Sequence, residues 1–343
     1  MNEGKRDMSN RSNRQFLIAA RPEGMVKESD FKYVETPVPE PGPGQFLIHQ
    51  EIVAVEPALR GQMENRANYA APLQIGDVMR ALGAGTVVES NNPDYKVGQR
   101  VQGLFGFQDY LVSDGKGMVS RIPDGVAGEA ALYVFGGTGF TAYYGMAEVG
   151  KPTPGCNVLV SGAAGAVGSL AGQIAKILGA GTVVGIAGSD EKCRWLTDEL
   201  GFDAAINYKT EDVAARVKEL FPKGLDIYYD NVGGEILDIA LANLAMNARV
   251  VICGGISRYN KSGPIEGPKN YFNLVYSRAT MTGFIIVDHV HRYKEWTENM
   301  GKWIADGKLK YRIDMLEGFE NLPKGLIRLF TGDNIGKQLI RIG

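Results

Sequence analysis

The stretch Asn157-Val-Leu-Val-Ser-Gly-Ala-Ala-Gly-Ala-Val-Gly-Ser169 limits the possible folds of this chain more than any other segment. Its apolar run 158–160 predicts a buried strand, and the small residues after it predict a tight turn before an amphipathic helix over 166–178. Between the two stands Ala163-x-Gly165-x-x-Gly168, a dinucleotide-binding fingerprint with alanine at its first glycine. Backbone N–H groups and the helix dipole at such a turn favour phosphate groups. We therefore expect a nucleotide cofactor to bind here.

Charge and composition argue against several other kinds of partner. The net charge of −2 and the pI near 6.0 give no reason to expect nucleic acid or an anionic membrane surface. No apolar run approaches the roughly 20 residues that span a bilayer. Residues 1–14 are polar and charged, unlike a secretory signal, and we expect a disordered lead-in. The three scattered cysteines predict a reducing, cytoplasmic location without a disulfide framework.

Two patterns of secondary structure follow one another along the chain. From residue 15 to about 110, short β-rich runs are separated by turn clusters, which predicts a mostly-β domain. The predicted strands are Phe16–Ala20, Phe31–Thr36, Phe46–Val55, Thr86–Ser90 and Arg100–Leu104. From Asn157 onward, strands and helices alternate, which predicts a parallel sheet covered by helices on both faces.

The alternating part accounts for most of the remaining chain. Its predicted strands are 158–160, 182–187, 204–207, 225–229, 249–253 and 280–286. Its predicted helices are 166–178, 190–200, 211–221, one from Gly234 to about Asn247, and 289–306. The elements 312–317, 320–330 and 338–342 have no place in that sheet, so we expect them to return to the β domain. The predicted fold class is α/β, with a mostly-β domain (15–138 and 312–343) into which a doubly wound parallel sheet (139–311) is inserted.

The end of the second strand of this sheet favours NADPH over NADH. An NAD-selective site usually places Asp or Glu about 20 residues past the fingerprint, where this chain has Gly188. The glycine leaves room for a 2′-phosphate, Ser189 can donate a hydrogen bond to it, and Lys192 and Arg194 are nearby cations. The two carboxylates after Ser189 weaken this prediction, and we interpret them as first-turn residues that complement the helix dipole.

A metal site is not indicated by the sequence. Zinc needs three or four converging Cys, His or carboxylate ligands, and the chain has three cysteines without a Cys-x-x-Cys pair. His49 lies inside a predicted strand and suits a packed surface position. His289 and His291 begin a predicted helix with no third ligand nearby in sequence. We therefore expect a metal-free protein.

Several motifs, in this order, resemble those of the zinc-independent medium-chain dehydrogenases/reductases, and within them the prostaglandin reductase, plant alkenal double-bond reductase and bacterial curcumin reductase group. The motifs are Ala163-Ala-Gly-Ala-Val-Gly-Ser169, Gly185-Ile-Ala-Gly-Ser-Asp-Glu-Lys192, Ile206-Asn-Tyr-Lys209, Asp230-Asn-Val-Gly-Gly234, Cys253-Gly-Gly-Ile-Ser-Arg-Tyr-Asn260 and Gly332-Asp-Asn334. The resemblance extends from about Phe16 to the C-terminus.

This resemblance implies NADPH-dependent reduction of the carbon–carbon double bond of α,β-unsaturated aldehydes and ketones, by direct hydride transfer without a metal. It also implies a GroES-like β domain with an inserted Rossmann domain, an active site in the cleft between them, and a homodimer. Together, the residues and the resemblance assign to the cofactor Thr141, Gly165, Ala166, Val167, Gly168, Gly188, Ser189, Lys192, Tyr208, Asn231, Cys253, Gly254, Ser257, Tyr259, Phe284, Ile286 and Asn334.

Tyr259 is the catalytic residue that the resemblance implies. Its phenol could hydrogen-bond the substrate oxygen that becomes enolate-like when hydride reaches the β-carbon. The alternative is that Tyr259 only supports the cofactor ribose or its own loop.

The expected substrate side departs from the family pattern. The family's Asp-Pro-Tyr-Met-Arg appears here as Glu56-Pro-Ala-Leu-Arg60, so that Ala58 replaces a pocket tyrosine and a roomier pocket is expected. Met63 and Tyr69 are further substrate-binding candidates, with a core position as the alternative for each. Two other functions stay open at this point: an NADPH quinone reductase of the same superfamily, and a non-catalytic NADPH-binding sensor.

Overall fold

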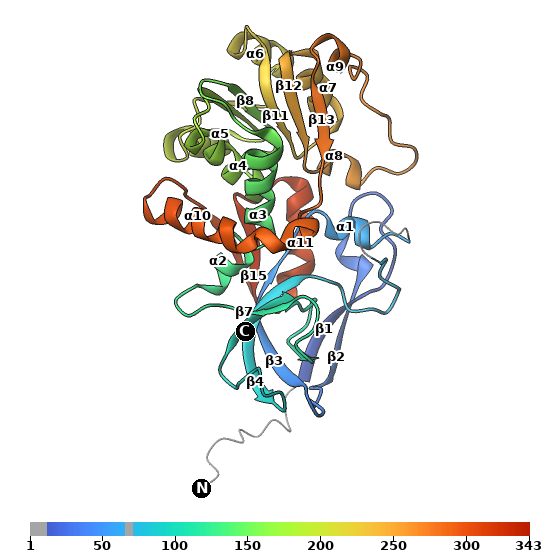
Figure 1. The fold of residues 1–343 in the computed structure, drawn as a ribbon. Helices are drawn as coiled ribbons and strands as arrows, with labels where there is room; N and C mark the ends of the chain where they lie inside the picture. Colours follow the sequence, from blue (N-terminus) through green and yellow to red (C-terminus); the bar gives the residue numbers. More distant parts are fainter. Residues whose placement is uncertain (1–11, 66–70) are drawn as a thin grey trace. The chain divides into compact units, whose positions relative to one another are not determined.

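The computed structural model describes residues 12–65 and 71–343, which fold into two compact units (Figure 1). The described part of the first unit comprises residues up to 132 together with 315–331 and 338–343, and the second comprises 133–314 and 332–337. The expected boundaries were at 138/139 and 311/312. The differences have a local cause, because the Tyr133 hydroxyl donates to the Ala166 carbonyl (2.9 Å) and the Gly336 N–H donates to the Ala164 carbonyl (2.8 Å).

The first unit is built on a seven-stranded sheet and a separate two-stranded ribbon. The ribbon pairs β1 (Ser12–Ile18) antiparallel with β2 (Phe31–Pro37). The larger sheet has the order β14-β15-β3-β4-β5-β7, and β6 pairs with β3. Its strands are β3 (Phe46–Ala54), β4 (Leu82–Ser90), β5 (Arg100–Leu104), β6 (Tyr110–Ser113), β7 (Val119–Arg121), β14 (Ile313–Glu317) and β15 (Lys337–Arg341). The C-terminal strands therefore return to the β unit, as the sequence predicted.

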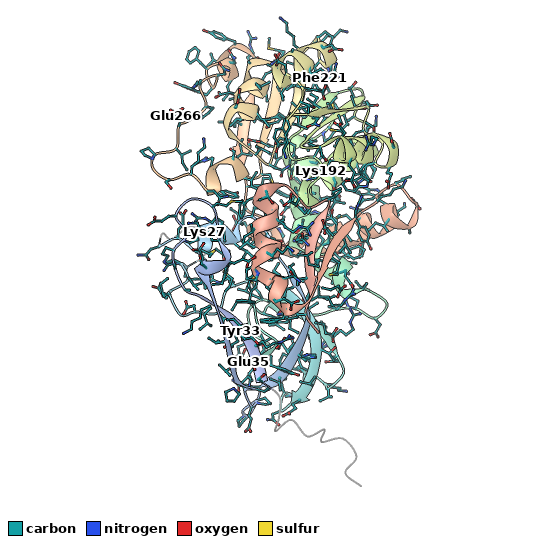
Figure 2. All side chains as sticks on the ribbon, turned by 180° about the vertical axis from the view of Figure 1, so that it is seen from behind. Lys27, Tyr33, Glu35, Lys192, Phe221 and Glu266 are labelled. Carbon is teal, nitrogen blue, oxygen red and sulfur yellow. The ribbon has the colours of Figure 1, made fainter. Side chains whose placement is uncertain are left out.

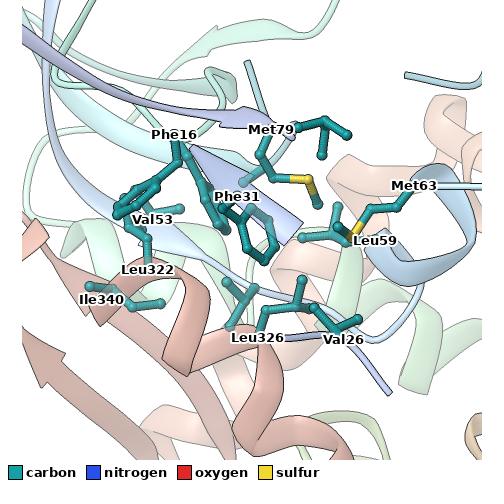
Figure 3. Close-up of a cluster of buried hydrophobic side chains, with 14 of the residues drawn as sticks. Phe16, Val26, Phe31, Val53, Leu59, Met63, Met79, Leu322, Leu326 and Ile340 are labelled. Atoms are coloured by element: carbon teal, nitrogen blue, oxygen red, sulfur yellow. The ribbon is translucent and has the colours of Figure 1, made fainter. Parts of the chain in front are cut away.

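One cluster of buried apolar side chains joins the two ends of the chain in the first unit (Figure 3). Phe16 of β1 stacks on Phe319, with ring centroids 5.4 Å apart. In the close-up, Leu322 and Leu326 of the C-terminal helix α11 (Leu322–Thr331) lie against the side chains that β1, β2 and β3 contribute. This core accounts for the return of the C-terminal segment, because burial of its apolar face is gained only there.

The expected lead-in is shorter than the sequence predicted. Residues 1–11 lie outside the described residues, but the three residues from Ser12 to Arg14 belong to β1. Arg14 forms a salt bridge with Asp109 (Nε to Oδ2, 2.7 Å), and the buried Asn13 amide donates to the Tyr110 carbonyl (3.0 Å). These polar residues look like loop residues in sequence because their partners stand nearly 100 positions away.

The second unit contains a parallel six-stranded sheet in the order β10-β9-β8-β11-β12-β13. Its strands are β8 (Asn157–Val160), β9 (Thr182–Ala187), β10 (Ala204–Asn207), β11 (Leu225–Asp230), β12 (Leu244–Ile252) and β13 (Thr280–Gly283). The central strands are buried almost throughout, as expected for a sheet that helices cover on both faces. The predicted α/β fold with a parallel sheet is confirmed.

The helices follow the sequence prediction with changes at their ends. The α-helices are α1 (Leu59–Gln62), α2 (Gly128–Leu132), α3 (Gly137–Tyr143), α4 (Ala166–Ile177), α5 (Asp190–Arg194), α6 (Val213–Leu220), α7 (Gly234–Ala242), α8 (Ile256–Tyr259), α9 (Asn273–Tyr276), α10 (Tyr293–Ala305) and α11. Shorter helical turns are η1 (Glu28–Asp30), η2 (Tyr144–Gly150), η3 (Trp195–Glu199), η4 (Ile286–Arg292) and η5 (Phe319–Asn321). No helix in the described ranges is long and apolar enough to cross a membrane.

Three predicted elements of the second unit, in two places, are wrong in extent. The helix expected to reach Asn247 ends at Ala242, because β12 begins at Leu244 and pairs with β11. The strand expected over 280–286 ends at Gly283, and the helix expected from His289 begins at Tyr293, after a 3-10 segment with a kink at His289. In both places the sheet or a kink overrides the local helical or strand pattern.

Candidate cofactor site

The order of strands in the second unit locates a binding edge. Numbered within this sheet, the order is 3-2-1-4-5-6, so the direction of winding reverses between β8 and β11. In open parallel sheets of this kind, ligands bind outside the carboxyl ends of the strands at such a reversal. The fingerprint turn follows β8, and Asn231 follows β11 directly. The sequence motifs and the sheet topology therefore indicate the same edge.

The turn after β8 has the backbone that a phosphate site needs. Gly162 has a positive φ of +57°, and Gly165 is the N-cap residue of α4 without any side chain to cap the helix. The first N–H groups of the helix have no intrahelical partner and remain available to an anion. A Cβ on Gly168 would lie 2.4 Å from the Gly162 carbonyl oxygen, so this glycine allows α4 to pack on the turn.

The end of β9 presents an aromatic wall instead of an acidic side chain. A Cβ on Gly188 would lie 2.9 Å from Cε1 of Tyr208, whose half-exposed ring therefore packs against the glycine. Ser189 is the N-cap of α5, where its hydroxyl oxygen accepts a hydrogen bond from the Lys192 N–H (3.3 Å). Its hydroxyl proton remains available to a ligand oxygen.

Two lysines gather beside this glycine. Lys192, on α5 and labelled in Figure 2, donates from Nζ to the Gly332 carbonyl at 2.7 Å. Burial lowers the pKa of Lys192, and the positive charge of Lys209 lowers it further. Lys209, which directly follows Tyr208, was not among the predicted cofactor residues, and the predicted second cation was Arg194. Arg194 lies exposed at the end of α5.

The first carboxylate after Ser189 has the structural role that the sequence suggested. Asp190 stands in the first turn of α5 and accepts a hydrogen bond from the Asn207 side chain (2.7 Å). It is therefore paired to β10, where it holds the end of that strand.

The loops after β11 and β12 bring the predicted nicotinamide-side residues together. The Asn231 side chain donates to the Ser161 carbonyl (2.7 Å), which ties the end of β11 to the end of β8. The Ser257 hydroxyl donates to the Val232 carbonyl (2.6 Å), which ties the loop after β12 to the same place. Burial raises the pKa of the Cys253 thiol to about 12, opposed by a hydrogen bond with Tyr229, so this thiol stays protonated.

Tyr259 is the last residue of the short helix α8, and its hydroxyl oxygen acts as a hydrogen-bond acceptor within the loop. The Gly255 N–H donates to the Tyr259 oxygen (3.2 Å), and burial raises the pKa of the phenol. The phenol is therefore neutral near pH 7. Its oxygen accepts one hydrogen bond, and its O–H proton remains available to donate another.

The remaining cofactor candidates come from elements distant in sequence. Thr141 of α3 donates from its hydroxyl to the Gly137 carbonyl (2.7 Å). Phe284 follows β13 and packs on Tyr144, with ring centroids 5.2 Å apart, and Ile286 begins η4. The segment that contains Asn334 is placed at the phosphate turn by a β-bridge between Gly165 and Gly336.

The predicted substrate-binding residues of the first unit differ in their burial. Ala58 is the half-buried N-cap of α1. Met63 is fully buried in the core cluster that Figure 3 shows, which favours its core alternative, and its role in substrate binding stays a prediction. Met63 is the C-cap residue of α1, and its side chain is directed toward Leu59 and Met79 in the core. Tyr69 lies outside the described residues.

The histidines take part in ring packing. His49 stacks on Tyr110 (4.7 Å between centroids), and His289 stacks on Tyr144 (4.0 Å). Within residues 12–65 and 71–343, no group of three or more His, Cys, Asp or Glu side chains is placed to hold a metal ion.

Comparisons with known proteins match this geometry. A family described as the N-terminal domain of oxidoreductase matches residues 14–120, and one described as zinc-binding dehydrogenase matches residues 166–306. The NADPH-dependent curcumin reductase of Escherichia coli (strain K12) is 39% identical over 335 residues, which cover 96% of this chain and 97% of that protein. The NADP(+)-dependent 2-alkenal reductase of Nicotiana tabacum is 37% identical, with 96% and 98% covered.

A solved structure agrees over the whole fold. The crystal structure of CurA from Vibrio vulnificus in complex with NADPH superposes with a TM-score of 0.92 at 38% identity, covering 96% of this chain and 99% of that one. A β unit with an inserted dinucleotide-binding unit defines the class of medium-chain dehydrogenases/reductases. The chain belongs to the zinc-independent group of this family, together with the prostaglandin, alkenal and curcumin reductases.

Proposed function

We propose that the protein reduces the carbon–carbon double bond of α,β-unsaturated aldehydes and ketones with NADPH and without a metal. The observation that carries the cofactor choice is Gly188 at the end of β9, flanked by Tyr208 and two lysines where an NAD-selective site has an acid. The substrate class is supported by the relatives named above, which are curcumin and 2-alkenal reductases.

The residues at the edge of the sheet fit NADPH. The uncapped start of α4 suits the pyrophosphate, and Gly188, Ser189, Lys192, Tyr208 and Lys209 suit the adenosine 2′-phosphate. When bound, NADPH supplies the hydride for the reaction. The proposed contacts on its nicotinamide side are Thr141, Asn231, Cys253, Gly254, Ser257, Tyr259, Phe284, Ile286 and Asn334.

Tyr259 is the proposed catalytic residue. Its oxygen accepts from the Gly255 N–H, which orients the phenol and leaves its proton to donate to the substrate oxygen. Negative charge develops on that oxygen during reduction, and a fixed donor stabilises it more than it stabilises the neutral carbonyl. The raised pKa of Tyr259 keeps this proton in place at neutral pH.

The test is NADPH oxidation by the purified protein against a simple alkenal, a phenyl-substituted enone, curcumin, a quinone and a saturated ketone, each repeated with NADH. Turnover of the enones with NADPH, and none of the saturated ketone, supports the proposal. Activity with the quinone alone would move the protein to quinone reduction. Tight NADPH binding without oxidation of any compound would favour a sensor.

Ala58 is the proposed determinant of substrate range. Because the family resemblance implies a pocket tyrosine at this position, we expect bulky enones to bind with less steric conflict when Ala58 stands there. Restoring the aromatic ring with Ala58→Tyr should raise KM for curcumin more than KM for a short alkenal. Equal effects on both substrates would contradict this role.

We also propose that the protein is a cytoplasmic homodimer. All three cysteines are free, which suits a reducing compartment. β13 is the last strand in its sheet order, all four of its residues are exposed, and an unpaired edge of this kind can pair with a second copy. Exposed apolar residues on β13 and after it extend this edge, namely Met281, Ile285, Val287 and Val290.

Light scattering coupled to size exclusion tests the dimer. The variant Met281→Glu should shift the mass to that of a monomer, since the buried charge would be costly at an interface. The control is Val97→Glu, which places the same charge at an exposed apolar position of the first unit. A dimer in both variants would contradict the β13 interface.

A further inference from the structure

A buried carboxylate joins the strand ends that carry the proposed cofactor site. Asp230 is the last residue of β11, and it is only 1% exposed. Its Oδ1 accepts hydrogen bonds from the Ser161 hydroxyl (3.0 Å) and the Tyr228 hydroxyl (2.7 Å). The same oxygen accepts from the N–H groups of Val232 (3.0 Å) and Gly233 (2.8 Å). The carboxylate therefore fixes both the end of β8 and the turn after β11.

The connection extends to a third strand through the main chain. The Asp230 carbonyl accepts from the N–H groups of Cys253 (2.9 Å) and Gly254 (3.0 Å), directly after β12. The Ser161 oxygen that donates to Asp230 in turn accepts from the Asn231 N–H (2.9 Å). Three loops that leave neighbouring parallel strands thus meet at Asp230. Its carboxylate binds the loops after β8 and β11, and its main-chain carbonyl binds the loop after β12.

We propose that Asp230 is a positioning residue for the cofactor: it holds the loops after β8, β11 and β12 in the arrangement that receives the pyrophosphate and nicotinamide half. Asp230 is buried behind these loops and acts through the residues that it orients. This inference rests on the proposed NADPH function. The adenosine 2′-phosphate end, at Gly188 and Lys192, receives no hydrogen bond from this network.

The chain offers a matched control at the opposite end of the same two strands. Asp226, near the start of β11, accepts from the Asn157 N–H at the start of β8 (2.8 Å). Asp230→Asn and Asp226→Asn therefore remove the same charge from the same strand pair, at its carboxyl and its amino end. Only the first lies at the edge where the cofactor is proposed to bind.

The experiment measures dissociation constants of the full-length protein for NADPH and for adenosine 2′-phosphate, together with Tm. Hydrogen bonds to a charged acceptor are the stronger kind, so Asp230→Asn should raise Kd for NADPH about tenfold. Its Kd for adenosine 2′-phosphate should stay within about twofold of the unaltered protein. Asp226→Asn should lower Tm with both constants unchanged. KM for NADPH should follow the same pattern.

Other outcomes overturn the inference. A lower Tm in Asp230→Asn with an unchanged Kd for NADPH would leave the carboxylate a purely structural role, and an equal loss of both ligands would indicate general damage. If Asp230→Asn does not fold, Ser161→Ala removes a single donor and should still raise Kd for NADPH by about threefold. An unchanged constant in that variant also refutes positioning. Failure of the unaltered protein to bind either ligand would instead reject the proposed function itself.

Discussion

The Lys192→Ala variant gives the sharpest test of the proposed 2′-phosphate site. Lys192 is half-buried, and its ammonium group lies 2.7 Å from the Gly332 carbonyl. Burial lowers the pKa of Lys192 and the charge of Lys209 lowers it further, against the opposing effect of Asp333, Asp314 and Glu191, so a phosphate dianion would stabilise the charged form of this lysine. Alanine removes this charge without adding any group that could clash.

The expected magnitude follows from burial. A hydrogen bond between charged groups contributes about 1.5–3 kcal/mol, and partial solvent screening places Lys192 near the lower value, or a little over tenfold in KM for NADPH. Lys209 is exposed, so Lys209→Ala should cost about 0.2–1 kcal/mol, or up to fivefold. KM for NADH should not change in either variant, since NADH carries no 2′-phosphate.

Steady-state assays with both cofactors across pH measure these effects. Because the pKa of Lys192 is lowered, its charge is lost at a lower pH than for an ordinary lysine. KM for NADPH should therefore rise as the pH rises through that lowered pKa, while KM for NADH stays flat. In Lys192→Ala this rise should disappear. An unchanged ratio of the two KM values in Lys192→Ala would refute the assignment of the 2′-phosphate to this lysine.

Four further variants test other parts of the structure. Tyr259→Phe should lower kcat for enone reduction about 10²-fold with little change in KM for NADPH, and an unchanged kcat would reduce Tyr259 to a structural role. Gly168→Ala, whose Cβ would lie 2.4 Å from a carbonyl oxygen, should lower the free energy of unfolding in urea by about 1–3 kcal/mol. Gly165→Ala, whose Cβ would lie 3.2 Å from its nearest atom, should lower it less and should mainly weaken NADPH binding in titrations. Trp296→Ala should destabilise the protein by about 3–5 kcal/mol by the same unfolding measurement, because this fully buried indole packs among four aromatic rings.

Sequence reasoning succeeded where the local pattern and the tertiary structure agree. The predicted strands over 100–104, 182–187 and 204–207 match the structure residue by residue, and the pattern is clearest over 182–187, which is rich in β-branched residues. Trp296, Met300 and Trp303 fall at helical spacing, which is typical of a packed stripe; on α10 the first two side chains are fully buried and Trp303 is half-buried. The inserted domain order also followed from the alternation of strands and helices.

The features that the sequence did not predict depend on contacts between segments distant in the chain. The segment 244–247 was predicted as helix, but Leu244 pairs with Leu225 of β11, the register shifts before Arg249, and Asn247 takes a positive φ of +61°. Lys209 was not weighed as a cation because its proximity to Lys192 exists only after β9 and β10 pair. The link between Asp230 and the end of β8 depends on Ser161, a donor that stands 69 positions away in the chain. Such contacts are set by the sheet and have no signal in a local window.

The dinucleotide-binding fingerprint shows that the backbone conformation of a motif matters more than an exact match to its consensus residues. Its first glycine is replaced by Ala163, which is fully buried and donates from its N–H to the Ile186 carbonyl at 3.0 Å. The left-handed conformation falls one residue earlier, at Gly162, where an L-residue would cost about 1–2 kcal/mol. The third glycine keeps its usual task, because α4 could not approach the turn with any side chain at 168. Since both physical requirements are met by glycines, the alanine leaves the phosphate turn intact, and the departure from the consensus does not count against a functional cofactor site.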